Sequence, residues 1–177
     1  TGSLTYVELF NATGADVNLA NYKLKVYTFG NNPTPGSAPN FSCDLTLSGT
    51  IANNETFVIK LSSSANQGGI TPDLAFTSCT GVNSNDFIKL TSITDVDIDL
   101  WGRTDGTHYT PEGDPGYTYR RLNTGVLPSS VWIPEDWTAI DPQDYTNVGS
   151  YEGLPLSGYE YSIDNGAQQS STIFTGL

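Results

Sequence analysis

Apolar and polar residues alternate in short runs along most of the chain, and Gly, Pro, Asn and Asp cluster between the runs. Alternation with a period of two is typical of strands, and the breaker clusters favour tight turns. No segment sustains the 3.6-residue period of an amphipathic helix. The pattern therefore predicts an all-β protein. Strands are expected near residues 4–10, 22–29, 42–48, 55–61, 73–78, 86–92, 95–101, 117–122, 137–140, 158–163 and 171–176.

The alternation also assigns faces to the expected strands. In the first strand Val7 and Leu9 share one face, while Tyr6, Glu8 and Phe10 share the other. Two half-buried sheets of this kind pack face to face, which predicts a β-sandwich of about 8–10 strands. The breaker-rich loop 30–39 is expected to cross from one sheet to the other.

The strand near 95–101 has the most regular alternation in the chain. Its apolar positions are expected on the core face: Val96, Ile98 and Leu100. Its acidic positions are expected together on the opposite face: Asp95, Asp97 and Asp99. Carboxylates two residues apart on a strand are separated by about 6–7 Å, so one or two of them would need loop carbonyls to complete a cation site.

Charge is sparse and one-sided, with 19 acidic and 7 basic residues in 177 and a net charge of −12. Such a surface repels phosphate backbones, so no nucleic-acid partner is expected, and it attracts divalent cations. Calcium, which takes six to eight oxygen ligands, is the expected ion; a merely solvated acidic surface is the alternative. The candidate ligands are Asp95, Asp97, Asp99, Glu112, Asp114, Asp141 and Asp144.

Two cysteines, Cys43 and Cys79, lie in separate strand-like stretches without metal-type spacing. They predict one disulfide and an oxidising, extracellular or cell-surface location, with two buried free thiols as the alternative. No apolar run is long enough to span a bilayer. Sequons for N-glycosylation begin at Asn11, Asn40 and Asn54 and matter only where the source organism glycosylates.

Several stretches, taken in order, resemble the lamin tail domain family in its secreted prokaryotic version. They are YVELFNATGADVNLANYKLKVY, LSGTIANNETFVI, NDFIKL, ITDVDIDLWG, YTYRRL and DWTAIDPQDYTNVGS. The resemblance covers about residues 5–150 and implies an immunoglobulin-like β-sandwich. It implies no reaction, because the family consists mostly of structural or interaction modules.

The chain departs from that family at both ends. Relatives have one more strand before the YVEL-like stretch, whereas only residues 1–3 precede it here, and this chain continues past the VGS-like position to Leu177. We therefore expect a lamin-tail-like sandwich over 1–152 and a C-terminal extension over 153–177. The extension carries two candidate strands, with apolar residues at Tyr159, Tyr161, Ile163, Ile173, Phe174 and Leu177.

Catalysis has little support in the sequence. The only histidine, His108, lies in a Gly/Thr-rich loop and is expected at the surface, and no Gly-x-Ser-x-Gly elbow occurs. Among the aromatics, Trp101 and Trp137 end apolar strand patterns and are expected in the core, although with Trp132 they could form a sugar-stacking face. Arg120 or Arg121 is expected to pair with a carboxylate.

These observations lead to one expected function and one alternative. A sandwich that lacks an edge strand exposes unpaired backbone around Tyr6, Val7 and Leu9, and the extension supplies segments that could pair with it. The extension could fold back on its own domain or complete the next subunit, and the second outcome would build an extracellular filament or tube with calcium-assisted acidic contacts. The alternative is a monomeric adhesion or carbohydrate-binding module that binds surface polysaccharide.

Overall fold

The structure is a computed structural model that describes residues 4–30, 33–110, 116–122, 127–140 and 143–151. The described residues form strands and two short 3-10 helices. The strands are β1 (Thr5–Phe10), β2 (Val17–Asn18), β3 (Tyr22–Thr28), β4 (Phe41–Thr46), β5 (Thr50–Ile51), β6 (Thr56–Leu61), β7 (Leu74–Phe76), β8 (Phe87–Ser92), β9 (Asp97–Trp101), β10 (Thr118–Arg121) and β11 (Trp137–Ile140). The 3-10 helices are η1 (Leu19–Asn21) and η3 (Pro134–Asp136).

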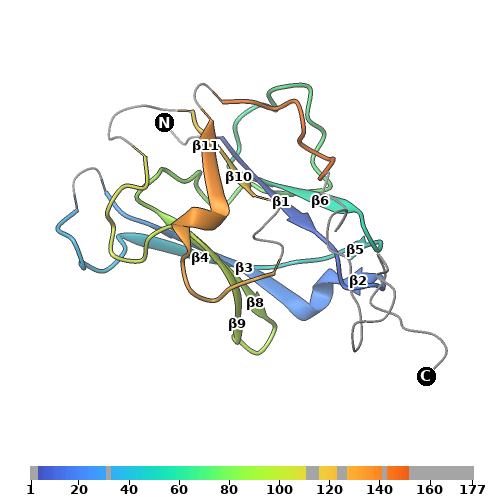
Figure 1. Cartoon of the computed structure of the whole chain (residues 1–177). Helices are drawn as coiled ribbons and strands as arrows, with labels where there is room; N and C mark the ends of the chain where they lie inside the picture. Colours follow the sequence, from blue (N-terminus) through green and yellow to red (C-terminus); the bar gives the residue numbers. More distant parts are fainter. Residues whose placement is uncertain (1–3, 31–32, 111–115, 123–126, 141–142, 152–177) are drawn as a thin grey trace, which may run out of the picture.

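Two sheets form the layers of a β-sandwich (Figure 1). One is four-stranded with the order β4-β3-β8-β9, and the other is three-stranded with the order β1-β6-β7. Neighbouring strands are antiparallel except β6 and β7. The all-β class and the sandwich expected from the alternation are confirmed, and the strands near 158–163 and 171–176 lie outside the described residues.

The core is built from the inward positions of the alternating strands. Val26 of β3 and Ile59 and Leu61 of β6 are 0% exposed. The outer face of β6 is also covered, since Val58 is 4% and even Lys60 only 9% exposed. The Lys60 ammonium reaches Asn66 Oδ1 at 2.8 Å, which satisfies one of its donors.

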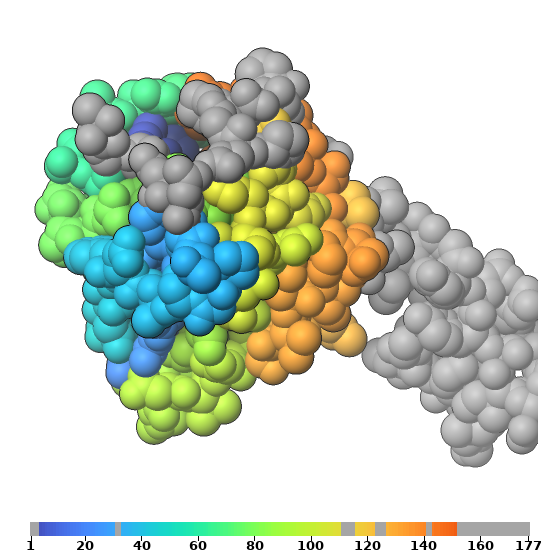
Figure 2. Space-filling view, turned by 90° about the vertical axis from the view of Figure 1, so that its left-hand side faces the viewer, coloured from blue at the N-terminus to red at the C-terminus, as the bar shows by residue number. Residues whose placement is uncertain are grey.

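A second apolar cluster lies on the outer face of the four-stranded sheet and consists of Phe29, Phe87 and Leu100. The loop after β9 covers it: Figure 2 shows this yellow loop between the blue β3–β4 loop and the orange region around β11. The backbone N–H of Gly36 donates to the Asp105 carbonyl at 2.7 Å, which joins the β3–β4 loop to the loop after β9.

The disulfide between Cys43 and Cys79 is confirmed, with 6.0 Å between the Cα atoms. Cys43 lies in edge strand β4, and Cys79 follows β7, the edge strand of the other sheet. The bond therefore ties the two layers together along one side of the sandwich.

Two expectations about the fold are wrong. The loop after β3 does not cross between sheets, because β3 and β4 are antiparallel neighbours in one sheet. The acidic positions near 95–101 do not share a face, because Thr91 lies opposite Asp97 and Leu90 lies opposite Asp99, so that β9 has one extra residue at this point. Such a bulge reverses the faces of the residues on its two sides.

The apolar residues of the same segment are also rearranged. Val96 is 63% exposed in the β8–β9 turn, and Leu100 is buried in the outer cluster rather than in the central core. In the described part of the chain, no helix is long and apolar enough to cross a membrane.

Replacing both Cys43 and Cys79 by Ala is expected to lower the free energy of unfolding by about 3–4 kcal/mol, because the crosslink no longer restricts the unfolded chain. Denaturant unfolding of this variant, compared with wild type before and after reduction, measures the loss. Reduced wild type should match the variant, and an unchanged unfolding midpoint would show that the disulfide contributes nothing.

A candidate assembly surface on strand β1

Within the described part of the chain, strand β1 is paired along one edge. It is antiparallel to β6, with Val7 opposite Ile59 and Leu9 opposite Phe57. The side chains of Val7 and Leu9 pack against the central core, as the alternation predicts. The backbone N–H of Asn11 donates to the Glu55 carbonyl at 3.0 Å, so the backbone groups of Asn11 point towards the β6 side. Because these directions alternate along a strand, the backbone groups of Leu9, Val7 and Thr5 also face β6.

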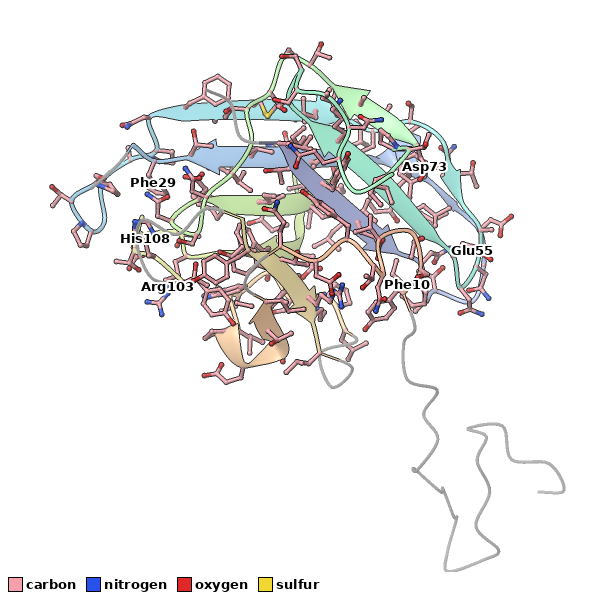
Figure 3. The ribbon with its side chains drawn as sticks, turned by 90° about the horizontal axis from the view of Figure 1, so that it is seen from above. Phe10, Phe29, Glu55, Asp73, Arg103 and His108 are labelled. Carbon is pink, nitrogen blue, oxygen red and sulfur yellow. A yellow bond between two sulfur atoms is a disulfide. The ribbon has the colours of Figure 1, made fainter. Side chains whose placement is uncertain are left out.

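The other edge of β1 therefore presents the backbone groups of Tyr6, Glu8 and Phe10. None of these groups makes a backbone hydrogen bond to another described residue, and β1 is the terminal strand of its sheet. Strand β10 lies beside β1 in Figures 1 and 3, but within the described residues it pairs only with β11. An unpaired row of donors and acceptors of this kind is a template for another strand.

Residues 145–151 cover the outer face of β1. The Tyr145 ring contacts the Tyr6 ring edge-on at 6.1 Å, and the Tyr151 ring contacts the Phe10 ring at 4.5 Å. Between them the Gly149 amide donates to the Glu8 carboxylate. The segment therefore runs in the same direction as β1 and brings the chain to the Phe10 end of the strand, where segment 152–177 begins.

Glu8 is the charged group on this face. Burial raises the pKa of Glu8 above its ordinary value, and the amide of Gly149 and the nearby charge of Arg120 act in the opposite direction. Arg120 is itself paired with Asp144 at 3.0 Å, and Asp144 exchanges hydrogen bonds with Thr118. The polar contacts connect β10 to β1 through the covering segment.

Strand β4 is also terminal in its sheet, but its surface differs from that of β1. Its outward side chains, Ser42, Asp44 and Thr46, are polar and exposed, and Cys43 is tied to the other layer. Polar and charged residues on an edge strand discourage pairing with other chains. By this comparison the edge of β1 is better suited than the edge of β4 to pair with a strand from another chain.

Of the assembly residues predicted from the sequence, Tyr6, Val7 and Leu9 lie on β1 as expected. The partners predicted in the C-terminal extension lie outside the described residues: Tyr159, Tyr161, Ile163, Ile173, Phe174 and Leu177.

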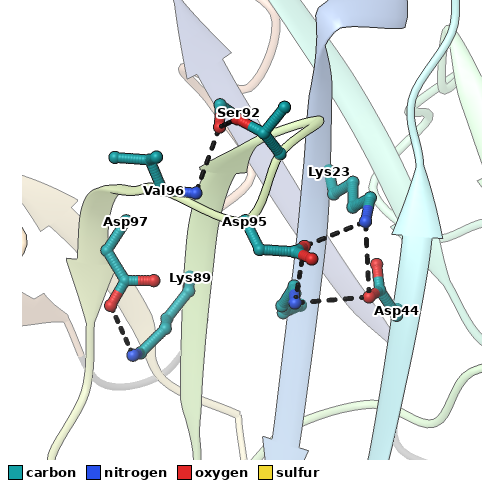
Figure 4. A network of polar contacts seen from close by, with 9 residues as sticks. Lys23, Asp44, Lys89, Ser92, Asp95, Val96 and Asp97 are labelled. Carbon is teal, nitrogen blue, oxygen red and sulfur yellow. Dashed lines mark hydrogen bonds and ion pairs between the residues drawn. The ribbon is translucent and has the colours of Figure 1, made fainter.

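The predicted calcium ligands in the described part are used in ion pairs with the chain's own cations. On the outer face of the four-stranded sheet, Asp95 pairs with Lys23 and Lys25 at 2.9 Å each, and Asp97 pairs with Lys89 at 2.6 Å (Figure 4). Hydrogen bonds from the two lysines lower the pKa of Asp95 to about 2.

Asp99 lies on the opposite face, and its two carboxylate oxygens accept hydrogen bonds from the two terminal guanidinium nitrogens of Arg121, at 2.7 and 2.8 Å. Together with the contact of Arg120 to Asp144, this confirms that the arginines pair with carboxylates. Among the described residues, no three acidic, histidine or cysteine side chains come together as a metal site. Glu112, Asp114 and Asp141 lie outside the described residues.

The tryptophans form a packed cluster with Tyr109 and Tyr119. Trp101 meets Trp132 at an interplanar angle of 75°, and Trp132 meets Tyr109 at 85°. Trp137 stacks on Arg121, whose guanidinium carbon lies 4.7 Å from the ring centre. Edge-to-face contacts stabilise a packed cluster but do not make the flat row of rings that a polysaccharide needs.

His108 is half-buried rather than fully exposed at the surface. Its Nδ1 lies 2.7 Å from Ser84 Oγ, and the Tyr109 amide donates to the Ser84 carbonyl. Nearby Asp86 is 1% exposed, and its two carboxylate oxygens accept the amides of Phe29 and Asn83. Burial raises the pKa of Asp86. The contacts of Ser84 fasten the loop after β9 to the segment before β8, and those of Asp86 join this segment to the end of β3.

No family model matches this chain, and no curated protein is significantly similar to it.

Asp95→Asn is expected to remove a pH-dependent part of the stability. Because the folded-state pKa of Asp95 is about 2 and its ordinary value is 3.8, its contribution is present above pH 3.8 and is lost as the pH falls towards 2. Asn tolerates the positive φ of 67° at this position. Thermal unfolding of both proteins between about pH 2 and 6 should show a gap that closes on acidification; a constant gap would contradict this assignment.

Proposed function

We propose that this protein is an extracellular structural subunit that assembles by pairing the free edge of β1 with the C-terminal segment of another copy. The observation that carries the proposal is the backbone of Tyr6, Glu8 and Phe10, which no other described residue pairs with, on a strand that is otherwise built into the core. Backbone pairing of this kind is a known mode of peptide recognition and gives affinity through the ladder.

The sequence of the extension provides suitable donors. Residues 159–163, YEYSI, alternate with Tyr159, Tyr161 and Ile163 on one face, and residues 171–177 contain Ile173, Phe174 and Leu177. Burial of three such side chains contributes roughly 5–9 kcal/mol before ordering costs. Tyr151, which precedes the extension in the sequence, packs against Phe10 at one end of the acceptor edge.

A contact in which one copy's extension fills the next copy's edge is head-to-tail. Such a contact does not close on itself and generates filaments or tubes. The same exit point would also allow the extension to fold back on its own β1, so concentration-dependent assembly is the property that separates the two arrangements.

Calcium would assist assembly by bridging acidic surfaces of adjacent copies. Five carboxylates, those of Asp44, Asp95, Asp97, Asp99 and Asp144, are paired with basic groups within the described residues. The net charge of −12 still makes neighbouring copies repel one another. A divalent cation held between copies reduces this repulsion and uses oxygens from both.

The disulfide supports an oxidising location outside the cell. The β-sandwich also agrees with membership of the lamin tail domain family, which we infer from the motifs quoted above. A polysaccharide partner is the weaker alternative, because the tryptophan cluster presents no flat row of rings.

A proline at position 8 tests the acceptor edge. The Glu8 amide points away from β6, so Glu8→Pro removes an external donor and leaves the internal ladder intact. We expect it to abolish filaments seen by electron microscopy and to leave a folded monomer in sedimentation. Glu8→Ala, which loses the side chain but keeps the amide, and Ser42→Pro, which blocks the β4 edge, should both still assemble.

Deleting residues 152–177 tests the donor. The truncated chain should not assemble, and neither should full-length Glu8→Pro. Mixing the two should give a one-to-one heterodimer that grows no further, because one supplies an intact extension and the other an intact edge. A wild-type chain that stays monomeric at high concentration with calcium present would make donation between copies wrong and favour the adhesion module.

Removal of divalent cations tests the role of calcium. Addition of EDTA should shorten or dissolve the filaments, and calcium should restore them at concentrations where the same ionic strength of sodium chloride does not. Light scattering measures this response. If sodium restores assembly equally, calcium acts only by screening.

A further inference from the structure

We propose that Asn54 is the attachment site of an N-linked glycan and that Asn11, which has the same sequon, is not. The sequence offers Asn11-Ala-Thr13, Asn40-Phe-Ser42 and Asn54-Glu-Thr56 with no means of ranking them. The structure places the three amide nitrogens in different surroundings, and glycan transfer requires that this nitrogen be free.

Asn11 is a structural residue. It is 3% exposed, and its Nδ2 donates to the carbonyls of Ala15 at 2.7 Å and Ile51 at 2.9 Å. Its Oδ1 accepts the Thr13 amide at 3.0 Å and the Thr13 hydroxyl at 2.8 Å. A sugar on Nδ2 would replace one donating hydrogen and would need space where the β1–β2 and β5–β6 turns meet. A glycan at Asn11 is therefore incompatible with this fold.

Asn54 lies at the tip of the turn between β5 and β6. The Glu55 amide donates to the Ala52 carbonyl at 3.1 Å and closes the turn, and Asn54 has a φ of 63°, which an Asn tolerates. Asn54 is exposed, and its side chain makes no hydrogen bond to the described residues. Figure 3 shows the neighbouring Glu55 at the outer margin of the molecule.

Asn40 is exposed but differs from Asn54 in the surroundings of its side-chain amide nitrogen. Its Nδ2 lies against Gly30, 2.6 Å from the position that a β-carbon on Gly30 would occupy. A sugar on that nitrogen would need room in the space beside Gly30. Among the three sequon asparagines, Asn54 has an exposed side chain that neither makes a hydrogen bond to the described residues nor lies close to a glycine in this way.

The donor substrate belongs to the class of lipid-diphosphate-linked oligosaccharides. The Asn54 nitrogen forms a bond to the anomeric carbon, the bond from that carbon to the diphosphate oxygen breaks, and the amide proton passes to a base of the transferase. The lipid diphosphate is the leaving group. Thr56, which supplies the hydroxyl of the sequon, is the first residue of β6.

A glycan at Asn54 is compatible with pairing at the free edge of β1. Asn54 lies on the β6 side of β1, where its backbone N–H donates to the backbone carbonyl of Asn11 at 2.7 Å. The acceptor groups of Tyr6, Glu8 and Phe10 point the other way. The proposal does not depend on assembly and survives if the protein is monomeric.

The test uses full-length protein from its natural source and from a secreting host with an N-glycosylation pathway. Glycopeptide mass spectrometry should find a glycan on Asn54 and none on Asn11. Thr56→Ala should remove at least about nine-tenths of the Asn54 occupancy, whereas Thr56→Ser, which keeps the hydroxyl, should retain it.

Asn54→Gly, which suits the positive φ, should be secreted and lack the same glycan mass. Folded protein from both sources that carries a glycan on Asn11, or on Asn40 with Asn54 unmodified, overturns the proposal. The absence of any glycan from both sources also overturns it.

Discussion

Each edge of a β-sheet carries backbone donors and acceptors that must be paired, covered or exposed to water, and this constraint organises the protein. On one side of the sandwich the disulfide from Cys43 to Cys79 ties the β4 edge to the segment after β7. On the other side, the hairpin β10–β11 covers β9 through the two-point contact of Arg121 with Asp99. The edge of β1 is the one whose surroundings favour another strand.

The arrangement of charges follows from the same architecture. Lysines on the outer face of the four-stranded sheet are held by Asp44, Asp95 and Asp97, and the arginines of β10 are held by Asp99 and Asp144. Basic residues are scarce in the sequence, and these Lys and Arg side chains form ion pairs that hold turns and strands together. The remaining acidic excess stays at the surface, where it opposes the approach of a second copy unless a cation intervenes.

The face covered by residues 145–151 links the fold to the proposed assembly. Aromatic contacts at Tyr6 and Phe10 and the hydrogen bond to Glu8 hold this segment against β1. This segment brings the chain as far as Tyr151, beside Phe10, and makes no backbone hydrogen bond to the edge of β1. Subunits that exchange segments need this combination, because a tethered donor has a high effective concentration at its own acceptor unless geometry sends it elsewhere.

The sequence by itself determined most of the strands, because alternation records which side chains are buried. Nine of the expected strands begin and end within two residues of β1, β3, β4, β6, β7, β8, β9, β10 and β11. It also predicted the disulfide, and the structure decided against the alternative of two free thiols. Only the tertiary structure decided the faces of Asp97 and Asp99, because one bulged residue reverses the alternation without any mark in the local pattern. It also decided which of the three sequons has an exposed side chain without hydrogen bonds, and which sheet edge the described residues leave unpaired, since both depend on contacts between segments far apart in the chain.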